Sequence, residues 1–338
     1  MTDEPLTHNP QNGVTGGVWR RGEVVHKVLT CRREVAAHWV ASEDPRHWNY
    51  WRREALVYRS GLPQRLGLGA PRLLHLEQTP DGDLELQLEH VHGHHGATLT
   101  VDDLEAAARM LGRSQGQAEL PQEPWFSERF LRAYGASKPA DWGLLDDDRA
   151  WAQPLIHKHF PASLRDGLMA LHRNRSRLLT LMERLPRTVC HLDVWPNNII
   201  RTADGEVVFL DWAFVGDGAL GEDIGNLVPD SVFDLLLRHE LLGELDQRLT
   251  EAYLDGLRDA GWRGDERLVR LGICASAVKY DWLTALTLER AADAEHLDYG
   301  QGARVDADER YAARAAGLAL CARWAQEAEQ LMSHGVTP

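Results

Sequence analysis

The sequence predicts an α+β fold, with a small antiparallel β-sheet in its N-terminal part and a mostly helical C-terminal part. Before residue 92, short apolar stretches alternate with turn sequences such as Arg21-Gly22 and Pro80-Asp81-Gly82, which is typical of hairpins. From Thr100 onward, apolar residues recur at helical spacing instead. We therefore divide the chain into regions 1–92 and 93–338.

Composition and charge are those of an ordinary soluble protein. The 338 residues are 43% hydrophobic and 26% charged, enough for one large domain or two closely joined lobes. The formal charge of −14 argues against a nucleic-acid partner. No apolar run approaches the ~20 residues of a membrane helix, and the polar, acidic N-terminus is no secretory signal. We expect a cytoplasmic monomer or homodimer with reduced thiols at the four scattered cysteines, Cys31, Cys190, Cys274 and Cys321.

A glycine-rich stretch, Gly13–Val18, lies near the N-terminus and contains Gly16 and Gly17. We expect it to form a turn between short strands, where backbone N–H groups can approach a phosphate without side-chain obstruction. No G-K-[ST] sequence follows, so it is not a Walker A loop. An ordinary hairpin turn is the alternative interpretation.

One lysine, Lys27, interrupts the apolar strand expected over Glu23–Leu29. A buried ammonium group needs an anionic partner, which would be a nucleotide phosphate or a carboxylate from a nearby helix. The helix expected over His47–Ser60 carries Glu54 beside its apolar stripe, where it can face Lys27. The alternatives are an edge-strand lysine that discourages aggregation and a surface pair between Glu54 and a neighbouring arginine.

Two more strands are expected over Pro71–His75 and Leu84–Leu88, and the second runs into Glu89–Val91. A connector at this point would offer backbone N–H and C=O groups to a purine base. Four histidines gather here, His90, His92, His94 and His95. No carboxylate or cysteine stands at a metal-ligand spacing beside them, so the sequence does not favour a metal site.

The remainder is expected to be mostly helical. Thr100-x-x-Asp103 predicts a capping box at the start of the first helix. Later helices are expected over Ser163–Leu185, Ser231–His239, Leu245–Ala260, Glu266–Glu289 and Ala307–Ser333. Segment 120–150 is expected to be irregular, either a substrate lid or a packed insertion.

The residues that indicate chemistry gather in Val189–Asn226. His191, Asp193 and Asn198 form the pattern H-x-D-x-x-x-x-N. The stretches NIIRT and EVVFLD follow it, and their β-branched residues around the turn at 203–205 predict a hairpin. The open end of this hairpin would bring Asn198 close to Asp211.

An amide oxygen and a carboxylate held together suit Mg²⁺, a hard cation that prefers oxygen ligands and usually keeps positions for phosphate. Asp193 would then accept a proton from an incoming hydroxyl group. Taken singly, Asp193 has an alternative as a turn cap and Asn198 as a strand-entry residue. Their combination with Asp211 predicts a phosphoryl-transfer site.

The order of these features resembles the kinase-like fold of the aminoglycoside phosphotransferase family and its relatives, the choline and methylthioribose kinases. The resemblance covers most of the chain and is strongest at His191–Asn226. Protein kinases share a base aspartate, a metal asparagine and a metal aspartate. Here Asp211-Trp212 stands where they have D-F-G, and no A-P-E sequence or long activation segment follows. The resemblance implies a small-molecule kinase with a protein-kinase-like two-lobe fold.

The same resemblance assigns roles around the transferred phosphate. Asp193 becomes the catalytic aspartate, and Asn198 and Asp211 become ligands of Mg²⁺ on the triphosphate of ATP or GTP. Lys27, held by Glu54, becomes the lysine of the α- and β-phosphates.

Further roles surround this group. Gly16 and Gly17 would cover the phosphates, and the connector with Glu89 and Val91 would face the adenine. His191 would be structural, and Asp223 would accept hydrogen bonds from the backbone of the catalytic loop. Leu192 and Trp195 depart from the residues commonest at their positions in the family and would reshape the pocket.

The acceptor is not specified by the motifs. Asp230, Asp234, Asp281 and Trp282 lie on segments that line the acceptor cleft in this family, where carboxylates would suit ammonium groups. Solvated helix faces and a core tryptophan are the alternative. We expect the acceptor to be a hydroxyl of an antibiotic (aminoglycoside-like or other), a sugar or an amino alcohol. A second functional class is a catalytically silent nucleotide-binding module that acts through protein partners.

Overall fold

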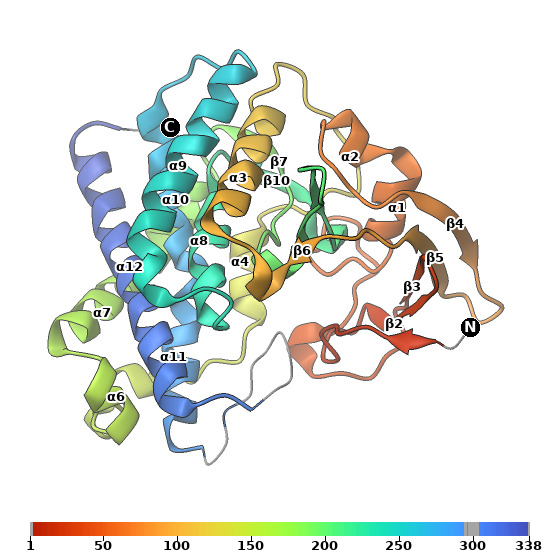
Figure 1. Cartoon of the computed structure of the whole chain (residues 1–338). Coiled ribbons are helices and arrows are strands. Elements are labelled where there is room, and N and C mark those ends of the chain that lie inside the picture. The colour runs from red at the N-terminus through yellow and green to blue at the C-terminus, as the bar shows by residue number, and fades with distance from the viewer. Residues whose placement is uncertain (1–2, 294–295, 297–303, 337–338) are drawn as a thin grey trace.

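A five-stranded antiparallel sheet forms the N-terminal part of the protein (Figure 1). The computed structural model describes residues 3–293, 296 and 304–336. The sheet has the strand order β1-β2-β3-β5-β4, with bounds β1 Glu4–Pro5, β2 Thr15–Arg21, β3 Val24–Leu29, β4 Leu73–Gln78 and β5 Leu84–Glu89. β3 is therefore central, and it places Lys27 opposite Val18 of β2 and Leu86 of β5.

Two helices, α1 Arg53–Ser60 and α2 Leu62–Arg65, lie in the chain between β3 and β4. Gly61 ends α1 with a φ of 63°, a left-handed conformation that favours glycine. α1 contacts β4 and also the 3₁₀ turn Trp212–Phe214 of the C-terminal part. Helix α1 thereby joins the sheet to the segment that follows Asp211.

Two small sheets organise the middle of the chain. β6 His94–His95 pairs with β8 Ile199–Arg201, which pairs with β9 Val207–Phe209. β7 Arg187–Cys190 pairs with β10 Gly216–Ala219. In the chain, the β8–β9 hairpin lies between β7 and β10. Helix α8 Glu222–Phe233 follows β10.

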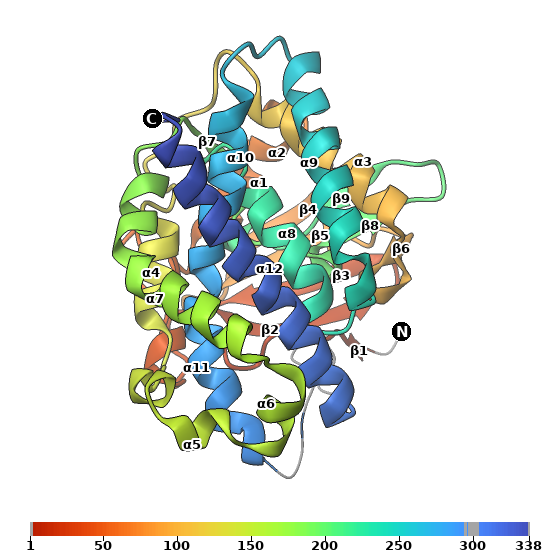
Figure 2. The same ribbon diagram turned by 90° about the vertical axis from the view of Figure 1, so that its left-hand side faces the viewer.

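Helices make up most of the rest of the C-terminal part (Figures 1 and 2). α7 and α12 contact each other on the face that Figure 2 turns toward the viewer. The bounds, besides α8, are α3 Val101–Gln115, α4 Phe130–Ser137, α5 Asp148–Trp151, α6 Pro154–His159, α7 Ala162–Met182, α9 Leu242–Asp259, α10 Glu266–Ala275, α11 Asp281–Glu289 and α12 Ala307–Ser333.

Glycines allow α3 and α9 to pack closely. A Cβ atom at Gly112 would lie 2.1 Å from the carbonyl oxygen of Tyr253, and one at Gly256 would lie 2.1 Å from that of Arg109. Backbone cannot yield to such contacts, so only glycine permits this approach of the two helices. The close packing fixes α3, whose Gln115 donates a hydrogen bond to Asp223.

Several sequence predictions are confirmed, beginning with the α+β two-lobe fold. The capping box is present, since Thr100 Oγ1 accepts a hydrogen bond from Asp103 N and Asp103 Oδ2 accepts one from Thr100 N. The predicted hairpin is β8–β9. Helices α7 and α9 lie within three residues of their predicted bounds, and α12 has the predicted bounds.

Other predicted elements are wrong. Gly16 and Gly17 lie inside strand β2, next to a register shift against β3, and not in a turn. The helix predicted from His47 begins only at Arg53, because the preceding residues form turns in which Asn49 Nδ2 donates to the carbonyl oxygens of Trp39 and Val40. Segment 120–150 contains α4 and α5 and is not simply irregular.

Two helix predictions after residue 220 also fail. The predicted helix at Ser231–His239 is α8, which begins at Glu222 and ends at Phe233. α8 contains Gly225 and Pro229 and is buried on almost every side, so it shows no amphipathic period. The long helix predicted over Glu266–Glu289 is divided into α10 and α11 by a 3₁₀ segment, Ser276–Tyr280.

Within the residues described, no helix combines the length and the apolar character that crossing a membrane requires.

Candidate active site

The β8–β9 hairpin brings Asn198 and Asp211 to one end, as the sequence predicts. Ile199 of β8 pairs with Phe209 of β9, and Leu210 N donates a 2.9 Å hydrogen bond to the carbonyl oxygen of Asn198. Asp211 follows directly with a φ of 54°, a left-handed conformation that aspartate tolerates better than most residues. The hairpin thereby sets one amide and one carboxylate side by side.

Asp193 lies against Asn198. Asn198 Nδ2 donates 2.9 Å hydrogen bonds both to the carbonyl oxygen of Asp193 and to Asp193 Oδ2. Burial, reinforced by the charge of Asp211, raises the pKa of Asp193 to about 7, although Lys279 and the Asn198 amide lower it. A carboxyl group with a pKa near neutrality is suited to accept a proton at physiological pH.

Lys27 joins the sheet to the hairpin. Its Nζ lies 2.6 Å from Glu54 Oε2 on α1 and 3.0 Å from Asp211 Oδ1. Burial alone lowers the pKa of Lys27, but the carboxylates of Asp211 and Glu54 outweigh it and raise the pKa above its ordinary value. Burial also raises the pKa of Glu54 to about 7 despite Lys27, because two carboxylates share one ammonium group. The predicted contact between Lys27 and Glu54 is present.

Asp223, at the start of α8, holds the backbone before Asp193. Its carboxylate accepts hydrogen bonds from His191 N at 2.9 Å, Leu192 N at 2.8 Å and Gln115 Nε2 at 2.7 Å. Leu192 has a φ of 67°, which is strained for a branched residue. The hydrogen bonds to Asp223 fix this strained turn and thereby the direction of Asp193.

His191 lies beneath the site and is buried. Its Nε2 donates to the carbonyl oxygen of Leu210 at 2.9 Å, and its Nδ1 accepts from Asp193 N at 3.3 Å. Burial lowers the pKa of His191 to about 4, so the ring is neutral at pH 7. A neutral ring bonded to both backbone segments suits a structural role.

Arg53 is a supporting residue that the sequence does not reveal. Its guanidinium is fully buried and donates to five carbonyl oxygens, those of Trp125, Trp48, Ala213, Pro45 and His47. Through Ala213 it holds the turn after Asp211, and through its own helix it holds Glu54. In the sequence, Arg53 stands beside Arg52, and the two look like ordinary surface arginines of a helix.

The connector after β5 has the expected course. Glu89 ends β5, and its side chain accepts from Arg72 N at 2.9 Å and pairs with the Arg72 guanidinium at 3.3 Å. Val91 follows outside the strand, with no backbone hydrogen bond to another described residue. Among the described residues the N–H and C=O groups of Val91 thus have no backbone partner, whereas the side chain of Glu89 is already paired.

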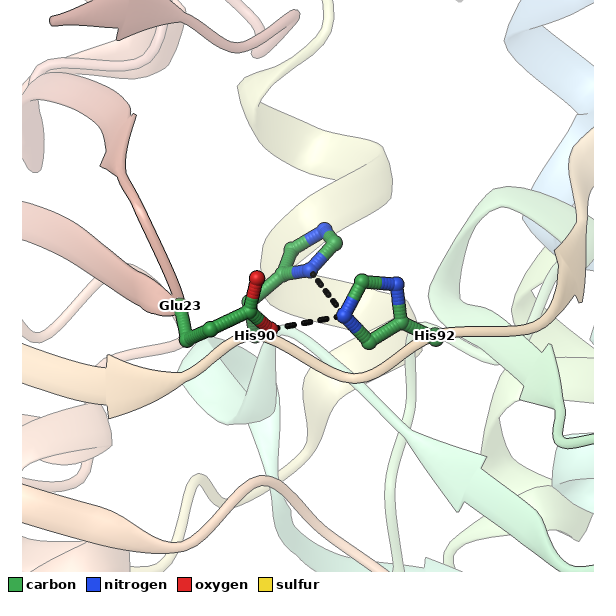
Figure 3. A group of neighbouring side chains, drawn as sticks. All are labelled: Glu23, His90 and His92. Carbon is green, nitrogen blue, oxygen red and sulfur yellow. Dashed lines mark hydrogen bonds and ion pairs between the residues drawn. The ribbon is translucent and has the colours of Figure 1, made fainter. Parts of the chain in front are cut away.

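A cluster of two histidines and a carboxylate lies where the β2–β3 turn meets this connector (Figure 3). His92 Nε2 lies 2.7 Å from Glu23 Oε2 and 3.4 Å from His90 Nδ1. Glu23 stands 67 residues before His90, so no local spacing indicates it. The three ligand atoms all lie within 4.8 Å of one another.

The carboxylates predicted for the acceptor side each contact a basic side chain. Asp230 Oδ2 lies 3.3 Å from Lys279 Nζ, Asp281 Oδ2 lies 3.0 Å from His172 Nδ1, and Asp234 Oδ1 lies 3.8 Å from Arg310 Nη1. These carboxylates thus already have partners within the chain, which weakens the prediction that they bind ammonium groups.

Trp282, the fourth predicted acceptor residue, borders an aromatic enclosure around Lys138. Lys138 Nζ lies 3.8 Å from the ring centre of Tyr134, 3.9 Å from that of Trp39 and 5.3 Å from that of Trp282. Burial and the nearby Lys279 lower the pKa of Lys138 to about 7, although the charge of Asp193 raises it. Lys138 and Asp193 are 55 positions apart, so no local spacing indicates this interaction.

The model of the family described as "APH: Phosphotransferase enzyme family" matches residues 32–266, a span that includes Glu54 and Asp193–Asp211 but begins after Lys27. No curated protein matches the sequence.

Two solved structures share the fold. An amicoumacin kinase, hAmiN, in complex with AMP-PNP, Ca²⁺ and Ami is 14% identical, with a TM-score of 0.51 over 97% of this chain and 88% of that chain. A choline/ethanolamine kinase family protein from Mesorhizobium loti is 16% identical, with a TM-score of 0.51 over 98% of this chain and 93% of that chain. At these identities the likeness concerns the fold alone.

Proposed function

The chain belongs to the phosphotransferase enzyme family, and we propose that it is a kinase that transfers the γ-phosphate of ATP or GTP to a hydroxyl group of a small molecule. One observation carries this proposal. The Asp193 carboxylate is held by the Asn198 amide, and Asp211 beside them pairs with Lys27, which Glu54 also holds. Phosphoryl transfer requires mainly positioning and charge stabilisation, and this group supplies both.

Asp193 is the base in this proposal. Its carboxylate orients the acceptor hydroxyl and takes its proton as the oxygen attacks the γ-phosphorus. The raised pKa, about 7, suits a group that must be ionised before the reaction and hold a proton after it. Asp223 and His191 act through the backbone by fixing the turn that aims Asp193.

Lys27 and the connector hold the nucleotide. Lys27 contacts the α- and β-phosphates while Glu54 keeps it extended from β3. The free backbone groups at Val91 face the purine. Gly16 and Gly17 act as part of strand β2 beneath the phosphates, where their lack of side chains keeps the backbone accessible. Residues 1–92 form the nucleotide lobe and residues 93–338 the acceptor lobe.

A divalent cation accompanies the nucleotide, and we assign it as Mg²⁺. The amide oxygen of Asn198 and the carboxylate of Asp211 are the oxygen donors that a hard cation prefers, and the Asn198 hydrogen bonds to Asp193 use only its NH₂ group. When bound, the cation would neutralise phosphate charge. The complex of hAmiN with AMP-PNP and Ca²⁺ supports a nucleotide with a divalent cation on this fold.

We place the acceptor among antibiotics, sugars and amino alcohols, and the enzyme in the cytoplasm as a monomer or homodimer without a nucleic-acid partner. Antibiotic resistance is one biological role that fits this range. The second functional class, a catalytically silent nucleotide-binding module that acts through protein partners, predicts nucleotide binding without turnover.

Incubation with Mg-ATP or Mg-GTP and a panel of hydroxyl compounds tests the proposal, with nucleoside diphosphate release as the readout. We expect turnover with at least one acceptor, and a decrease of about 10²–10⁴-fold in kcat for Asp193→Asn with nucleotide affinity retained. Asp204→Asn, in the exposed hairpin turn, is the matched control. Turnover by Asp193→Asn at the wild-type rate would show that Asp193 is not the base. Nucleotide binding without any turnover would support the silent module.

A further inference from the structure

Lys138 is a buried lysine that lacks a carboxylate partner among the described residues. Its ammonium group lies instead among rings contributed by separate parts of the chain, Trp39 from the 3₁₀ turn Ala37–Trp39, Tyr134 from α4 and Trp282 from α11. Aromatic faces attract a cation but do not neutralise it. A buried ammonium normally requires an anion in direct contact, and Lys138 has none among the described residues.

The charge of Asp193 raises the pKa of Lys138, but burial and the charge of Lys279 outweigh it, and no ion pair joins Lys138 to Asp193 within the described residues. Asp230 and Asp281 have partners of their own, since Asp230 is 3.3 Å from Lys279 and Asp281 is 3.0 Å from His172. Lys279 in turn lies 5.8 Å from the ring centre of Tyr134, on whose face Lys138 also rests. Two ammonium groups therefore flank Tyr134, and within the described part of the chain Lys279 has a carboxylate partner while Lys138 has none.

A second buried donor without a partner lies beside Lys138. Trp282 Nε1 is buried and makes no hydrogen bond within the described part of the chain. An indole N–H only donates, as an ammonium group does. The two unsatisfied groups therefore require the same complement, an oxygen acceptor, and a negatively charged one satisfies both best.

We propose that Lys138 and Trp282 form a subsite for one anionic group, a carboxylate or a phosphate, of the molecule whose hydroxyl faces Asp193. This inference rests on the proposed function and narrows it, because it favours hydroxy acids and phosphorylated alcohols over polyamines. A cationic acceptor group would meet Lys138 and Lys279, both of which would repel it.

The scarcity of lysine makes a direct test practical. The chain contains four lysines, Lys27, Lys138, Lys158 and Lys279, so a protein labelled with ¹³C-lysine gives four ε-carbon signals that single substitutions assign. Lys158 is the internal control, because it is exposed and already paired with Asp308. Acetate, inorganic phosphate and tetramethylammonium are the probes, each added to the nucleotide-free protein.

We expect acetate or phosphate to shift the Lys138 signal saturably and to leave the Lys158 signal unchanged. A response to acetate alone identifies a carboxylate subsite, and a response to phosphate alone identifies a phosphate subsite. A shift with tetramethylammonium but with neither anion would overturn the proposal, since the rings would then form a cation site. No saturable shift with any probe would also overturn it. This measurement requires no turnover, so its failure is distinct from failure of the kinase assignment.

A kinetic test applies to any acceptor that the panel identifies. Lys138→Met should raise KM for an anionic acceptor at least tenfold and leave KM for the nucleotide unchanged. Lys158→Met should change neither constant. An acceptor that carries ammonium groups only, with KM lowered by Lys138→Met, would contradict the anionic subsite.

The cluster of Glu23, His90 and His92 supports an independent inference (Figure 3). A tetrahedral zinc ion with bonds of about 2.0–2.1 Å separates its ligand nitrogens by about 3.3 Å. His90 Nδ1 and His92 Nε2 are 3.4 Å apart, and Glu23 Oε2 is the adjacent carboxylate oxygen, 2.7 Å from His92 Nε2. Only the carboxylate must withdraw slightly to admit an ion.

We infer that these three side chains bind Zn²⁺ or a similar divalent transition metal, with water in the remaining position. The ion would join the β2–β3 turn to the connector after β5, two segments that already share a 2.9 Å hydrogen bond from His90 N to the Glu23 carbonyl oxygen. Arg20 Nη1 lies 3.4 Å from His90 Nε2 and keeps a positive charge nearby, so we expect modest affinity.

Calorimetric titration of the untagged protein with Zn²⁺ in the absence of nucleotide measures this site, and the visible absorption of bound Co²⁺ reports its coordination. We expect one saturable site that His92→Ala and His90→Ala abolish and Glu23→Gln weakens. His94→Ala is the matched control, because His94 is an exposed neighbour outside the cluster. Equal affinity of His92→Ala and His94→Ala, or no saturable binding to the wild type, would refute the site.

Discussion

Lys27 and Lys138 are both buried, yet their surroundings are opposite. Lys27, in the middle of the sheet, lies within 3.0 Å of two carboxylates, which raise its pKa. Lys138, at the end of α4, lies among aromatic rings, and burial lowers its pKa to about 7. The first is fixed as a cation whether or not a ligand is present. Lys138, in contrast, would be stabilised in its protonated form by a bound anion. This is the behaviour expected of a residue that binds an anionic ligand.

The two sides of Asp193 are therefore built differently. On the side that we assign to the nucleotide, Lys27 pairs with both Glu54 and Asp211. On the side that we assign to the acceptor, Asp230, Asp234 and Asp281 each have a basic partner, whereas Lys138 has no ion-pair partner among the described residues. Four substitutions, in order of decreasing expected effect, would break or sharpen this contrast.

Lys27→Met removes the cation from two carboxylates, one of which, Glu54, is 2% exposed. We expect the free energy of unfolding at pH 8 to fall by about 3–5 kcal/mol, because breaking a buried pair leaves an uncompensated charge. Urea unfolding measures it. Arg32→Met, which breaks an exposed pair with Asp83 in the same region, should change it far less, because solvent screens an exposed ion pair. If the two substitutions lowered the free energy of unfolding equally, the contacts of Lys27 with Glu54 and Asp211 would not behave as a buried ion pair.

Lys138→Met should act in the opposite direction. The pKa of Lys138 falls from 10.5 to about 7 on folding, so the unfolded chain binds the proton more tightly and wild-type stability rises between these two pH values. We expect the substitution to raise the free energy of unfolding by about 1–3 kcal/mol at pH 6–7, less than the pKa change alone implies because cation–π contacts are lost. The gain should shrink as the pH approaches 10.5. A loss of stability that is the same at every pH would contradict this account.

Lys279→Met should shift the pH dependence of kcat/KM. Lys279 lowers the pKa of Asp193, whereas Asp230, freed of its partner, raises it. Because Asp193 must be ionised to act as the base, we expect the acid limb of kcat/KM to move to higher pH. Lys158→Met should leave the limb in place. An unchanged limb in Lys279→Met would show that another group controls the profile.

Thr100→Ala should have the smallest effect and touches neither lysine. Loss of the N-cap of α3 should lower the free energy of unfolding by about 1 kcal/mol, as measured by urea unfolding, with KM values unchanged. A change in KM would mean that loosening of α3 alters the site through the hydrogen bond from Gln115 to Asp223.

The parts of the site that the sequence predicts are those set by local geometry. Asn198 and Asp211 meet because a hairpin with a short turn returns the chain to its starting point. The contact between Lys27 and Glu54 is also predictable, since a lysine in an apolar strand requires a carboxylate. Element bounds fail where burial is complete, as in α8, because a helix surrounded by protein shows no period.

The residues that the sequence does not reveal act over long separations. Arg53 donates to Ala213 across 160 positions, and Glu23 approaches His92 across 69. Arg53 and Glu23 look like ordinary surface residues until folding buries the first and brings the second beside two histidines. Lys138 lies in a segment expected to be irregular, and its enclosure draws on Trp39, Tyr134 and Trp282.

The sequence by itself determines the α+β fold, the hairpin with its candidate metal ligands and the phosphoryl-transfer pattern, because these depend on periodicity and on residues close together in the chain. Only the tertiary structure decides which charges are compensated. Whether a carboxylate is free to meet a substrate depends on the cation that folding places beside it, and no spacing encodes that cation. Asp230, Asp234 and Asp281 have basic partners for this reason, whereas Lys138 has no ion-pair partner among the described residues.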